Sequence, residues 1–452
     1  MHAETAGAPT GSVVIVAGEP SGDAVAAELV RALRRRRPEL TFWGIGGPRM
    51  AEAGVELLFN CKEWASIGVV DALRLVPRLA WQVMPALVGE IRRRRPSVVV
   101  PIDFGAFNMG FARRLAGWGP PVVYYFPPGS WRKTGTVPPE IGRLCKAVIT
   151  PFPWSEERLR AAGANAHFVG HPLVDLARPT RSRAQFARDH GMEADHPVVG
   201  LLPGSRGFEI RYNLPAMLAA AWLICDEMPQ ARFVIGLAPS ADPARAEAMI
   251  RRADDEHSGP ALPRPAAERS GPQAVRAPRA ALAAASGGSL PNDVITDARS
   301  LGEPRFRVTV PRPDALPVVI TQGRTYDVIA ASDALLVCSG TATLEAAIMG
   351  TPMAVLYKLS PIMEMEGRLR GLHKRLKHIA MPNVAADRTI VKEYLQGAAT
   401  PEALAQEMLR LLKSGEARSQ MRTELAEVRD MMGAPGASDR AAGIVLQCAE
   451  PA

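Results

Sequence analysis

Short apolar runs alternate with longer amphipathic segments in two blocks along the chain, and this alternation limits the possible folds more than any other property of the sequence. Runs such as "VVIVAG" (13–18) and "SVVVPID" (97–103) are rich in β-branched residues. This pattern is typical of strands that are buried on both faces of a parallel sheet. Segments with helical periodicity follow several of these runs. The alternation therefore predicts a doubly wound α/β fold, in which ligands bind at the carboxyl ends of the strands.

The two blocks predict two Rossmann-like domains. The first block has expected strands at 13–18, 41–47, 97–103, 121–126, 146–152 and 166–172, and expected helices at 22–36, 69–94 and 105–117. The second block has expected strands at 197–205, 231–239, 333–340 and 352–358, and expected helices at 209–228 and 343–349. We place the first domain at 1–175 and the second at 176–385. Helices over 386–452 are expected to pack back on the first domain, and Thr400 and Pro401 suit a helix N-terminus.

Residues 253–305 differ from the rest of the second block. Ala, Pro, Gly, Ser and Arg dominate this stretch, and no hydrophobic period survives in it. We interpret it as a low-complexity insertion in the second domain, and a solvated loop is favoured over a tethering role.

The chain of 452 residues is long enough for two hydrophobic cores. Its five cysteines have neither C-x-x-C spacing nor neighbouring ligands, which favours a reducing compartment and argues against a zinc site. No secretory signal is visible at the start, and charged residues interrupt the most apolar later stretch. We therefore expect a cytoplasmic protein without a transmembrane helix.

A formal net charge of +8 favours anionic partners. The arginine runs at 31–38 and 91–96 each close a helical pattern, where arginine complements the negative end of the helix dipole. A basic face is the alternative interpretation. Because the chain has no zinc-finger, RNP or aromatic-interleaved basic motif, we do not expect nucleic acid as a partner.

Three glycine-rich turns follow predicted strands and precede predicted helices. They are "VAGEPSGD" (16–23), "LLPGSRGFEI" (201–210) and "CSGTATLEAAIMG" (338–350). The unpaired N–H groups and the positive dipole at a helix N-terminus suit a phosphate group. None of the turns matches a Walker A motif or a full G-x-G-x-x-G, so each alone is weak evidence.

Together the turns favour a nucleotide-sugar donor in the second domain. The residues expected to bind this donor are Gly204, Ser205, Arg206, Ser339, Gly340, Thr341 and Glu345. The helix N-terminus would take the diphosphate, and the Glu345 carboxylate would accept the ribose hydroxyls. Since no D-x-D-like pair accompanies the turns, we expect no metal and no cofactor, and Arg206 with the helix dipole would stabilise the leaving group.

These motifs resemble those of the lipid-A-disaccharide synthase family. The resemblance rests on "VAGEPSGD", "FWGIGGPRM", "VGHPLVD", "LLPGSRGFEI" and "CSGTATLEAAIMGTPMAVLYK", in the family's order, and on "MPNVAADRTIVKEYLQ" toward the C-terminus. It covers the chain from about residue 12 to 430, apart from the insertion. The resemblance implies a GT-B fold, with two Rossmann-like domains facing a cleft.

The resemblance also implies an activity, which is inverting, metal-independent transfer of a diacylated glucosamine from UDP to a diacylglucosamine 1-phosphate. The products would be a β-1,6 disaccharide of the lipid A type and UDP. Because both substrates carry acyl chains, we expect a peripheral protein at the inner face of the inner membrane, with an anionic membrane surface as a partner. The segment from Ile67 to Ile91 is a candidate for docking on that surface, and an ordinary core helix is an equal alternative.

The departures from the family pattern lie in the acceptor-side motifs. The family usually has G-I-D-A-P-D-F-N where this chain has "PIDFGAFN", so Asp103 and Asn108 remain but Ala106 replaces the second acid. "YYFPPGSWRK" (124–133) is shorter than the family's segment and lacks one tryptophan. In "ASIGVVDAL" (65–73), Ile67 and Asp71 replace the usual methionine and glutamate.

Asp103 is the predicted general base, which takes the proton of the acceptor hydroxyl. Its alternative is an N-cap for the helix expected at 105–117. Glu19 is the second predicted catalytic residue, because it precedes a turn that faces the cleft. The residues predicted to bind the acceptor are Ser21, Gly22, Asp23 and Asn108. For His171 we favour a structural role at the domain junction, with a bond to the backbone, over a second base.

Two alternatives to this activity remain at this point. One is another UDP-sugar GT-B enzyme with a different acceptor, or an epimerase of the same fold. The other is a catalytically inert homologue that binds a nucleotide sugar or a lipid. The intact donor turns argue against inertness, and the altered acceptor motifs argue for it.

Overall fold

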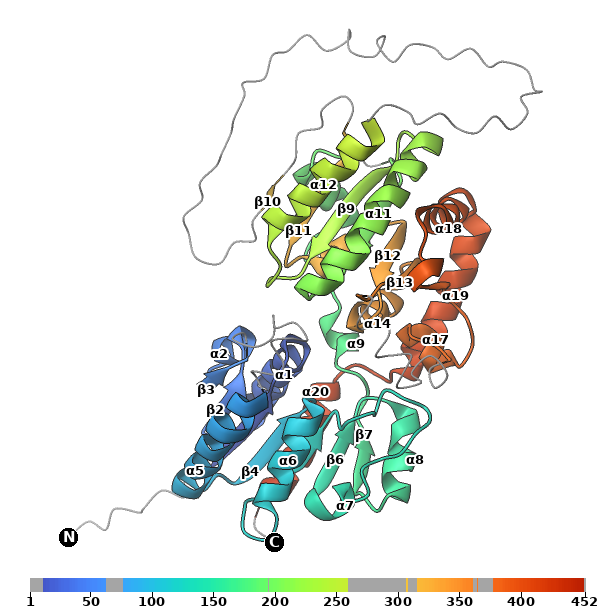
Figure 1. The fold of residues 1–452 in the computed structure, drawn as a ribbon. Helices are drawn as coiled ribbons and strands as arrows, with labels where there is room; N and C mark the ends of the chain where they lie inside the picture. The colour runs from blue at the N-terminus through green and yellow to red at the C-terminus, as the bar shows by residue number, and fades with distance from the viewer. Residues whose placement is uncertain are drawn as a thin grey trace, which may run out of the picture.

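A computed structural model describes residues 11–61, 76–193, 195–258, 306–307, 315–360, 364 and 377–450. It has two α/β units stacked one above the other, each built on one sheet (Figure 1). The strand orders are β3-β2-β1-β4-β5-β6-β7 and β10-β11-β9-β8-β12-β13-β14. Every strand pair is parallel except β10 with β11. The predicted doubly wound architecture is therefore confirmed for both blocks.

Ten strands expected from the sequence are present; nine are shorter than predicted, and β1 is shifted by one residue. The first sheet contains β1 (Ser12–Ala17), β2 (Thr41–Gly46), β3 (Glu56–Asn60), β4 (Val98–Ile102), β5 (Val123–Tyr125), β6 (Ala147–Thr150) and β7 (Ala166–Phe168). The second contains β8 (Val198–Leu202), β9 (Arg232–Leu237), β10 (Phe306–Arg307), β11 (Val318–Gln322), β12 (Ala334–Cys338), β13 (Met353–Tyr357) and β14 (Glu393–Leu395). Strands β3, β10, β11 and β14 were not predicted from the sequence, and β3, β10 and β14 lie at sheet edges.

The helices connect these strands. In the first unit they are α1 (Pro20–Arg36), α2 (Pro48–Glu52), the π-helical turn η1 (Leu79–Val83), α5 (Met84–Arg94), α6 (Gly105–Leu115), α7 (Ile141–Leu144) and α8 (Pro153–Ala161). After them come α9 (Leu173–Leu176), α10 (Arg183–Asp189), α11 (Gly207–Glu227), α12 (Pro243–Ser258), α13 (Thr325–Ala331), α14 (Thr341–Ile348) and α17 (Met381–Ala386). The chain ends with η3 (Gln396–Ala398), α18 (Pro401–Lys413), α19 (Gly415–Met431) and α20 (Ala437–Ala449).

The arginine runs lie at helix ends, as the dipole interpretation predicts. Helix α1 has Arg34, Arg35 and Arg36 in its last turn, and α5 has arginines at 92–94 in the same place. Arg94 pairs with both Glu56 carboxylate oxygens at 2.7 Å and lies 4.8 Å from the Trp43 ring centroid. This arginine therefore fastens the end of α5 to the sheet.

The chain crosses between the units twice, and the two crossing segments are hydrogen-bonded to each other. The His171 N–H donates to the Met432 carbonyl at 2.8 Å, and the Asp175 carboxylate accepts from the Gly436 N–H at 2.8 Å. His171 Nδ1 accepts from the Leu173 N–H at 3.1 Å. Burial lowers the pKa of His171 to about 3, so the ring is neutral at physiological pH. The structural role predicted for His171 is confirmed.

The C-terminal helices divide between the two units. Helices α18 and α19 pack on α11 and α14 of the second unit, whereas α20 returns to α1 (Figure 1). Ala441, Ala442 and Val445 of α20 are fully buried in the same core as β1 and β4. The domain boundaries at 175 and 385 stay a prediction.

Two predicted segments lie partly outside the described residues. Of the expected insertion, residues 253–258 continue α12, and 259–305 are outside the described residues. Of the expected docking segment, 67–75 are outside them as well. In the part of the chain that the structure describes, no helix is both long and apolar enough to span a bilayer.

Candidate active site

The predicted catalytic residue Glu19 faces the second unit at the carboxyl end of β1. It precedes α1, but its side chain makes no capping hydrogen bond to that helix. Its Oε2 instead lies 3.3 Å from Nη2 of Arg206, which follows β8. The ion pair therefore joins a predicted catalytic residue to a predicted donor-binding residue. Since both side chains are more than two-fifths exposed, the pair itself adds little stability.

Asp103 lies beside this ion pair, at the carboxyl end of β4. It does not cap the following helix, because α6 has Phe104 at its N-cap position and no side-chain capping bond. Both Asp103 and Phe104 have left-handed backbones, with φ of 48° and 51°. The Phe104 ring occupies the space over Gly18, where an added Cβ would lie 2.3 Å from Cγ of the ring. This contact brings the turn after β4 against the turn after β1.

The surroundings of Asp103 make its carboxyl a weaker acid than an ordinary aspartate. Asp103 is an exposed residue, but the protein around it removes part of the hydration of its charged carboxyl. This desolvation, with the negative charge of Glu19, raises the pKa of Asp103 from 3.8 to about 6. The Phe104 N–H and the Arg206 charge oppose the increase in pKa. A carboxyl with this pKa is ionised at neutral pH and can still accept a proton there.

The predicted acceptor-binding residues have different surroundings. Ser21 is exposed and Gly22 is buried at the start of α1. The buried Asp23 carboxylate accepts hydrogen bonds from the N–H groups of Gly47 at 2.8 Å, Met50 at 3.0 Å and Arg49 at 3.1 Å, and so fixes the start of α2. Asn108 is fully buried and donates to main-chain carbonyls. The acceptor role of these four residues stays a prediction.

The predicted donor turn after β8 is organised by Glu209, which the sequence analysis missed. The Glu209 carboxylate accepts from the N–H groups of Ser205 at 2.8 Å and Arg206 at 3.0 Å. Gly204 has a φ of 117°, and a Cβ there would lie 2.5 Å from the Glu209 Cβ. An acid three residues after the N-cap is a known capping signal, and it could have identified Glu209. Because these N–H groups already donate to Glu209, they are not available to a phosphate. The group of this turn that can bind a phosphate is then the Arg206 guanidinium.

The predicted donor turn after β12 leads into α14, and no side chain caps this helix. Gly340 and Thr341 are exposed at its start, and the Ser339 hydroxyl donates to the Ile379 carbonyl at 2.9 Å. One turn later, Glu345 Oε1 accepts from the Tyr326 hydroxyl at 3.1 Å. Burial raises the pKa of Glu345, and the Tyr326 hydrogen bond and the Arg49 charge of the first unit lower it. No sequence motif pointed to Tyr326.

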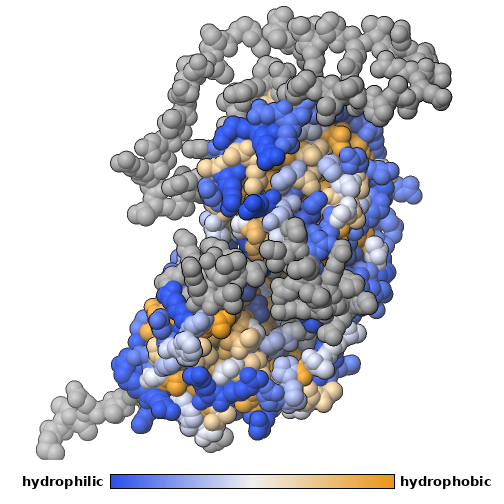
Figure 2. Space-filling view, viewed as in Figure 1, coloured by the Kyte–Doolittle hydropathy of each residue, from blue (hydrophilic) through white to orange (hydrophobic). Residues whose placement is uncertain are grey.

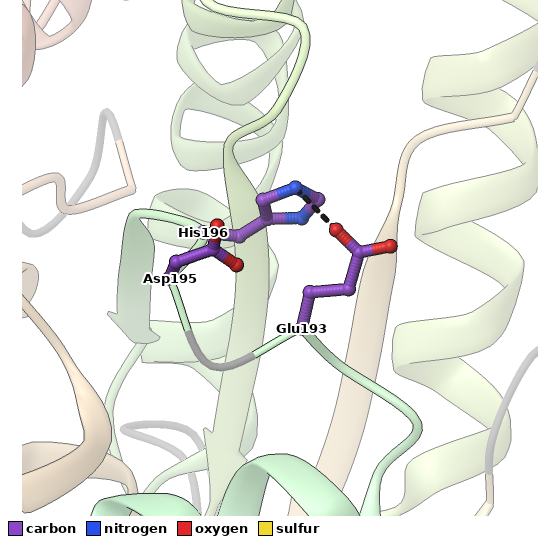
Figure 3. Close-up of side chains that lie close together, drawn as sticks. All are labelled: Glu193, Asp195 and His196. Atoms are coloured by element: carbon purple, nitrogen blue, oxygen red, sulfur yellow. Dashed lines mark ion pairs between the residues drawn. The ribbon is translucent and has the colours of Figure 1, made fainter.

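A separate cluster of possible metal ligands lies directly before β8, at the amino end of that strand (Figure 3). Glu193, Asp195 and His196 have ligand atoms within 4.8 Å of one another, and His196 Nε2 lies 2.7 Å from Glu193 Oε2. These residues precede β8, whereas Arg206 follows it. The cluster is therefore remote from Asp103 and Glu345, and we assign it no part in the site.

Comparison with known proteins points to one family. The family model described as "Lipid-A-disaccharide synthetase" matches residues 13–286 and 309–442. A lipid-A-disaccharide synthase of Myxococcus xanthus (strain DK1622) is 35% identical over 440 residues, which cover 97% of this chain and 98% of that protein. One of Geobacter sulfurreducens is 35% identical over 436 residues and 96% of each chain.

Solved structures show the fold. The UDP-GlcNAc 2-epimerase of Neisseria meningitidis, bound to UDP-GlcNAc, has a TM-score of 0.57 at 11% identity, with 96% of this chain and 99% of that chain covered. Acinetobacter baumannii MurG has a TM-score of 0.50 at 14% identity, with 97% and 99% covered. These likenesses establish the GT-B fold alone. With the family match over most of its length, the chain belongs to the lipid-A-disaccharide synthase family of GT-B glycosyltransferases.

Proposed function

We propose that the chain transfers a diacylated glucosamine from a UDP donor to the 6-hydroxyl of a diacylglucosamine 1-phosphate. The products are UDP and a β-1,6-linked disaccharide of the lipid A type. The full-length match to lipid-A-disaccharide synthases carries this proposal. The proximity of Glu19 and Asp103 to Arg206 supports the proposal, because the predicted catalytic residues of the first unit lie next to a predicted donor-binding residue of the second.

The donor binds to the second unit. Its diphosphate lies between the uncapped N-terminus of α14 and the Arg206 guanidinium, which stabilise the charge that develops on UDP as it leaves. Glu345, oriented by Tyr326, accepts hydrogen bonds from the ribose hydroxyls. When Arg206 turns toward the diphosphate, it releases Glu19 to orient the acceptor.

The acceptor binds to the first unit, beside Asp103. Its 6-hydroxyl attacks the anomeric carbon of the donor while the bond from that carbon to the UDP oxygen breaks, so the configuration inverts. The hydroxyl proton passes to the Asp103 carboxylate, whose pKa of about 6 leaves it ionised at neutral pH. Asp103 acts alone here because Ala106 stands at the position of the family's second acid.

The first unit docks on an anionic membrane surface at the inner face of the inner membrane. Exposed apolar side chains support this part of the proposal, since Trp81 is 78% exposed and Val76 is 64% exposed. Hydrophobic residues also gather between hydrophilic ones on the visible face of this unit (Figure 2). Arg92 of the same unit supplies a cation that complements anionic lipid, and it lies 4.6 Å from the ring centroid of Trp118, which is 43% exposed.

The test is UDP release and disaccharide formation from UDP-diacylglucosamine and diacylglucosamine 1-phosphate, with the purified protein and with Asp103→Asn. We expect loss of turnover in Asp103→Asn at unchanged UDP affinity, and no effect of EDTA on the parent protein. Asp439→Asn is the matched control, because Asp439 is an exposed carboxylate paired with Arg35 at 3.0 Å.

Three results would contradict the proposal. Full turnover in Asp103→Asn would mean that Asp103 is not the general base. UDP release only with another acceptor would indicate a different transferase. UDP binding without release under any acceptor would indicate an inert binding protein.

A further inference from the structure

The turn that carries Asp103 has an unfavourable backbone. Asp103 and Phe104 are consecutive non-glycine residues with positive φ, and both lie in the left-handed region. Such conformations cost free energy and persist only where the surrounding structure imposes them. Since the direction of the Asp103 side chain depends on this backbone, the groups that hold the turn also determine where the carboxylate points.

Two buried side chains hold the Asp103 carbonyl oxygen. The Tyr124 hydroxyl donates to it at 2.9 Å, and Asn108 Nδ2 donates to it at 2.8 Å. Both residues are fully buried. Asn108 Nδ2 also lies 3.2 Å from the Ile102 carbonyl and 3.3 Å from the Val16 carbonyl, so one amide group contacts both β4 and β1.

We propose that Asn108 and Tyr124 are positioning residues for the transfer reaction, which hold the Asp103 carbonyl oxygen so that the carboxylate points at the acceptor hydroxyl. The inference rests on the proposed role of Asp103 as base. It changes the role predicted for Asn108, which acts here from beneath the turn and does not touch the acceptor. It also gives a role to Tyr124, to which the sequence analysis assigned none.

The neighbouring tyrosine provides a matched comparison. Tyr125 is fully buried like Tyr124, on the same strand, and its side chain belongs to the core on the opposite face of the sheet. Among the described residues, its hydroxyl has no hydrogen-bond partner. A Tyr→Phe change therefore removes one oxygen atom at either position, but only at Tyr124 does it remove a bond to the Asp103 turn.

The experiment compares Tyr124→Phe with Tyr125→Phe in the full-length protein. We expect Tyr124→Phe to lower kcat by about tenfold, because small displacements of a reacting group cost large factors in rate. The dissociation constant for UDP should stay within about twofold in both variants, and Tyr125→Phe should keep the parent kcat. Loss of kcat without loss of UDP affinity is a result that general destabilisation does not produce. Asn108→Ala, checked by thermal unfolding, should lower kcat in the same way.

A double variant tests whether Tyr124 acts through Asp103. Adding Tyr124→Phe to Asp103→Asn should leave the residual turnover unchanged, because the group that Tyr124 positions is already gone. Equal kcat values for Tyr124→Phe and Tyr125→Phe, with Asp103→Asn inactive, would overturn the positioning role and leave the base role intact. The positioning role would also be overturned if Tyr124→Phe lowered kcat by the same factor in the Asp103→Asn background as in the parent protein. Parent-like turnover of Asp103→Asn alone would refute the base role, and the positioning role with it.

Discussion

The pH dependence of turnover should be governed by Asp103 and should respond to Glu19. With a pKa of about 6, about nine-tenths of the Asp103 carboxyls are ionised at pH 7, and about one-tenth at pH 5. Because a general base acts only when ionised, kcat/KM should fall about tenfold between these two pH values. With the ordinary value of 3.8, the carboxyl would stay more than about nine-tenths ionised at pH 5, and kcat/KM would hardly change.

Glu19→Gln tests the cause of the raised pKa. The negative charge of Glu19 raises the pKa of Asp103, so its removal should move the acid limb of the kcat/KM profile to lower pH. The profile of kcat/KM is the appropriate measurement, since it reports the groups of the free enzyme. The absolute rate of Glu19→Gln can fall if Glu19 orients the acceptor, but the position of the limb is independent of that fall.

Two results would refute this reasoning. A parent profile that is flat from pH 7 to pH 5 would mean that no carboxyl with a pKa of about 6 controls turnover. An acid limb that stays in place in Glu19→Gln would mean that the two carboxylates do not interact. Glu28→Gln is the control, because Glu28 lies further along α1 and pairs with Arg31.

Three further predictions concern stability and donor binding. Asp23→Ala leaves three N–H groups at the start of α2 without their acceptor, so the free energy of unfolding in urea should fall by about 2–4 kcal/mol, against about 0.5 kcal/mol or less for exposed Asp439→Ala. Tyr326→Phe removes the hydrogen bond to Glu345, so UDP affinity measured by calorimetry should fall about 3- to 10-fold, whereas Tyr125→Phe should leave it unchanged. The pKa of His171 is lowered from 6.5 to about 3 in the native state. Between these pH values the unfolded chain binds a proton that the native state does not bind. The free energy of unfolding should therefore fall as the pH decreases from about 6.5 toward 3. His171→Asn should reduce that dependence in urea titrations at several pH values.

Each of these predictions has a contradicting result. Equal unfolding free energies for Asp23→Ala and Asp439→Ala would mean that the three bonds to α2 add nothing. Unchanged UDP affinity in Tyr326→Phe would mean either that Glu345 does not bind the ribose or that Tyr326 does not orient Glu345. If the unfolding free energy of His171→Asn depends on pH as it does in the parent, the dependence comes from groups other than His171.

Local patterns in the sequence were enough to predict the architecture. Ten strands were predictable because buried parallel strands need continuous apolar runs, and that requirement is local. The N-terminus of α18 was predictable for the same reason, since Thr400 accepts from the Ala403 N–H three residues away. Strands β10 and β14, of two and three residues, were missed because such short elements carry no period of their own.

Which groups share the site depends on contacts between distant segments of the folded chain. Glu19 and Arg206 are 187 residues apart in the chain, and no sequence spacing encodes their separation of 3.3 Å. Asp103 could have been a helix cap by its sequence, and it is the folded backbone, with Phe104 at the N-cap, that excludes this role. Its pKa likewise depends on desolvation and on Glu19, which come from packing between distant segments. Residue types and local periods therefore predicted the elements and the candidate groups, whereas long-range packing set their distances, charges and roles.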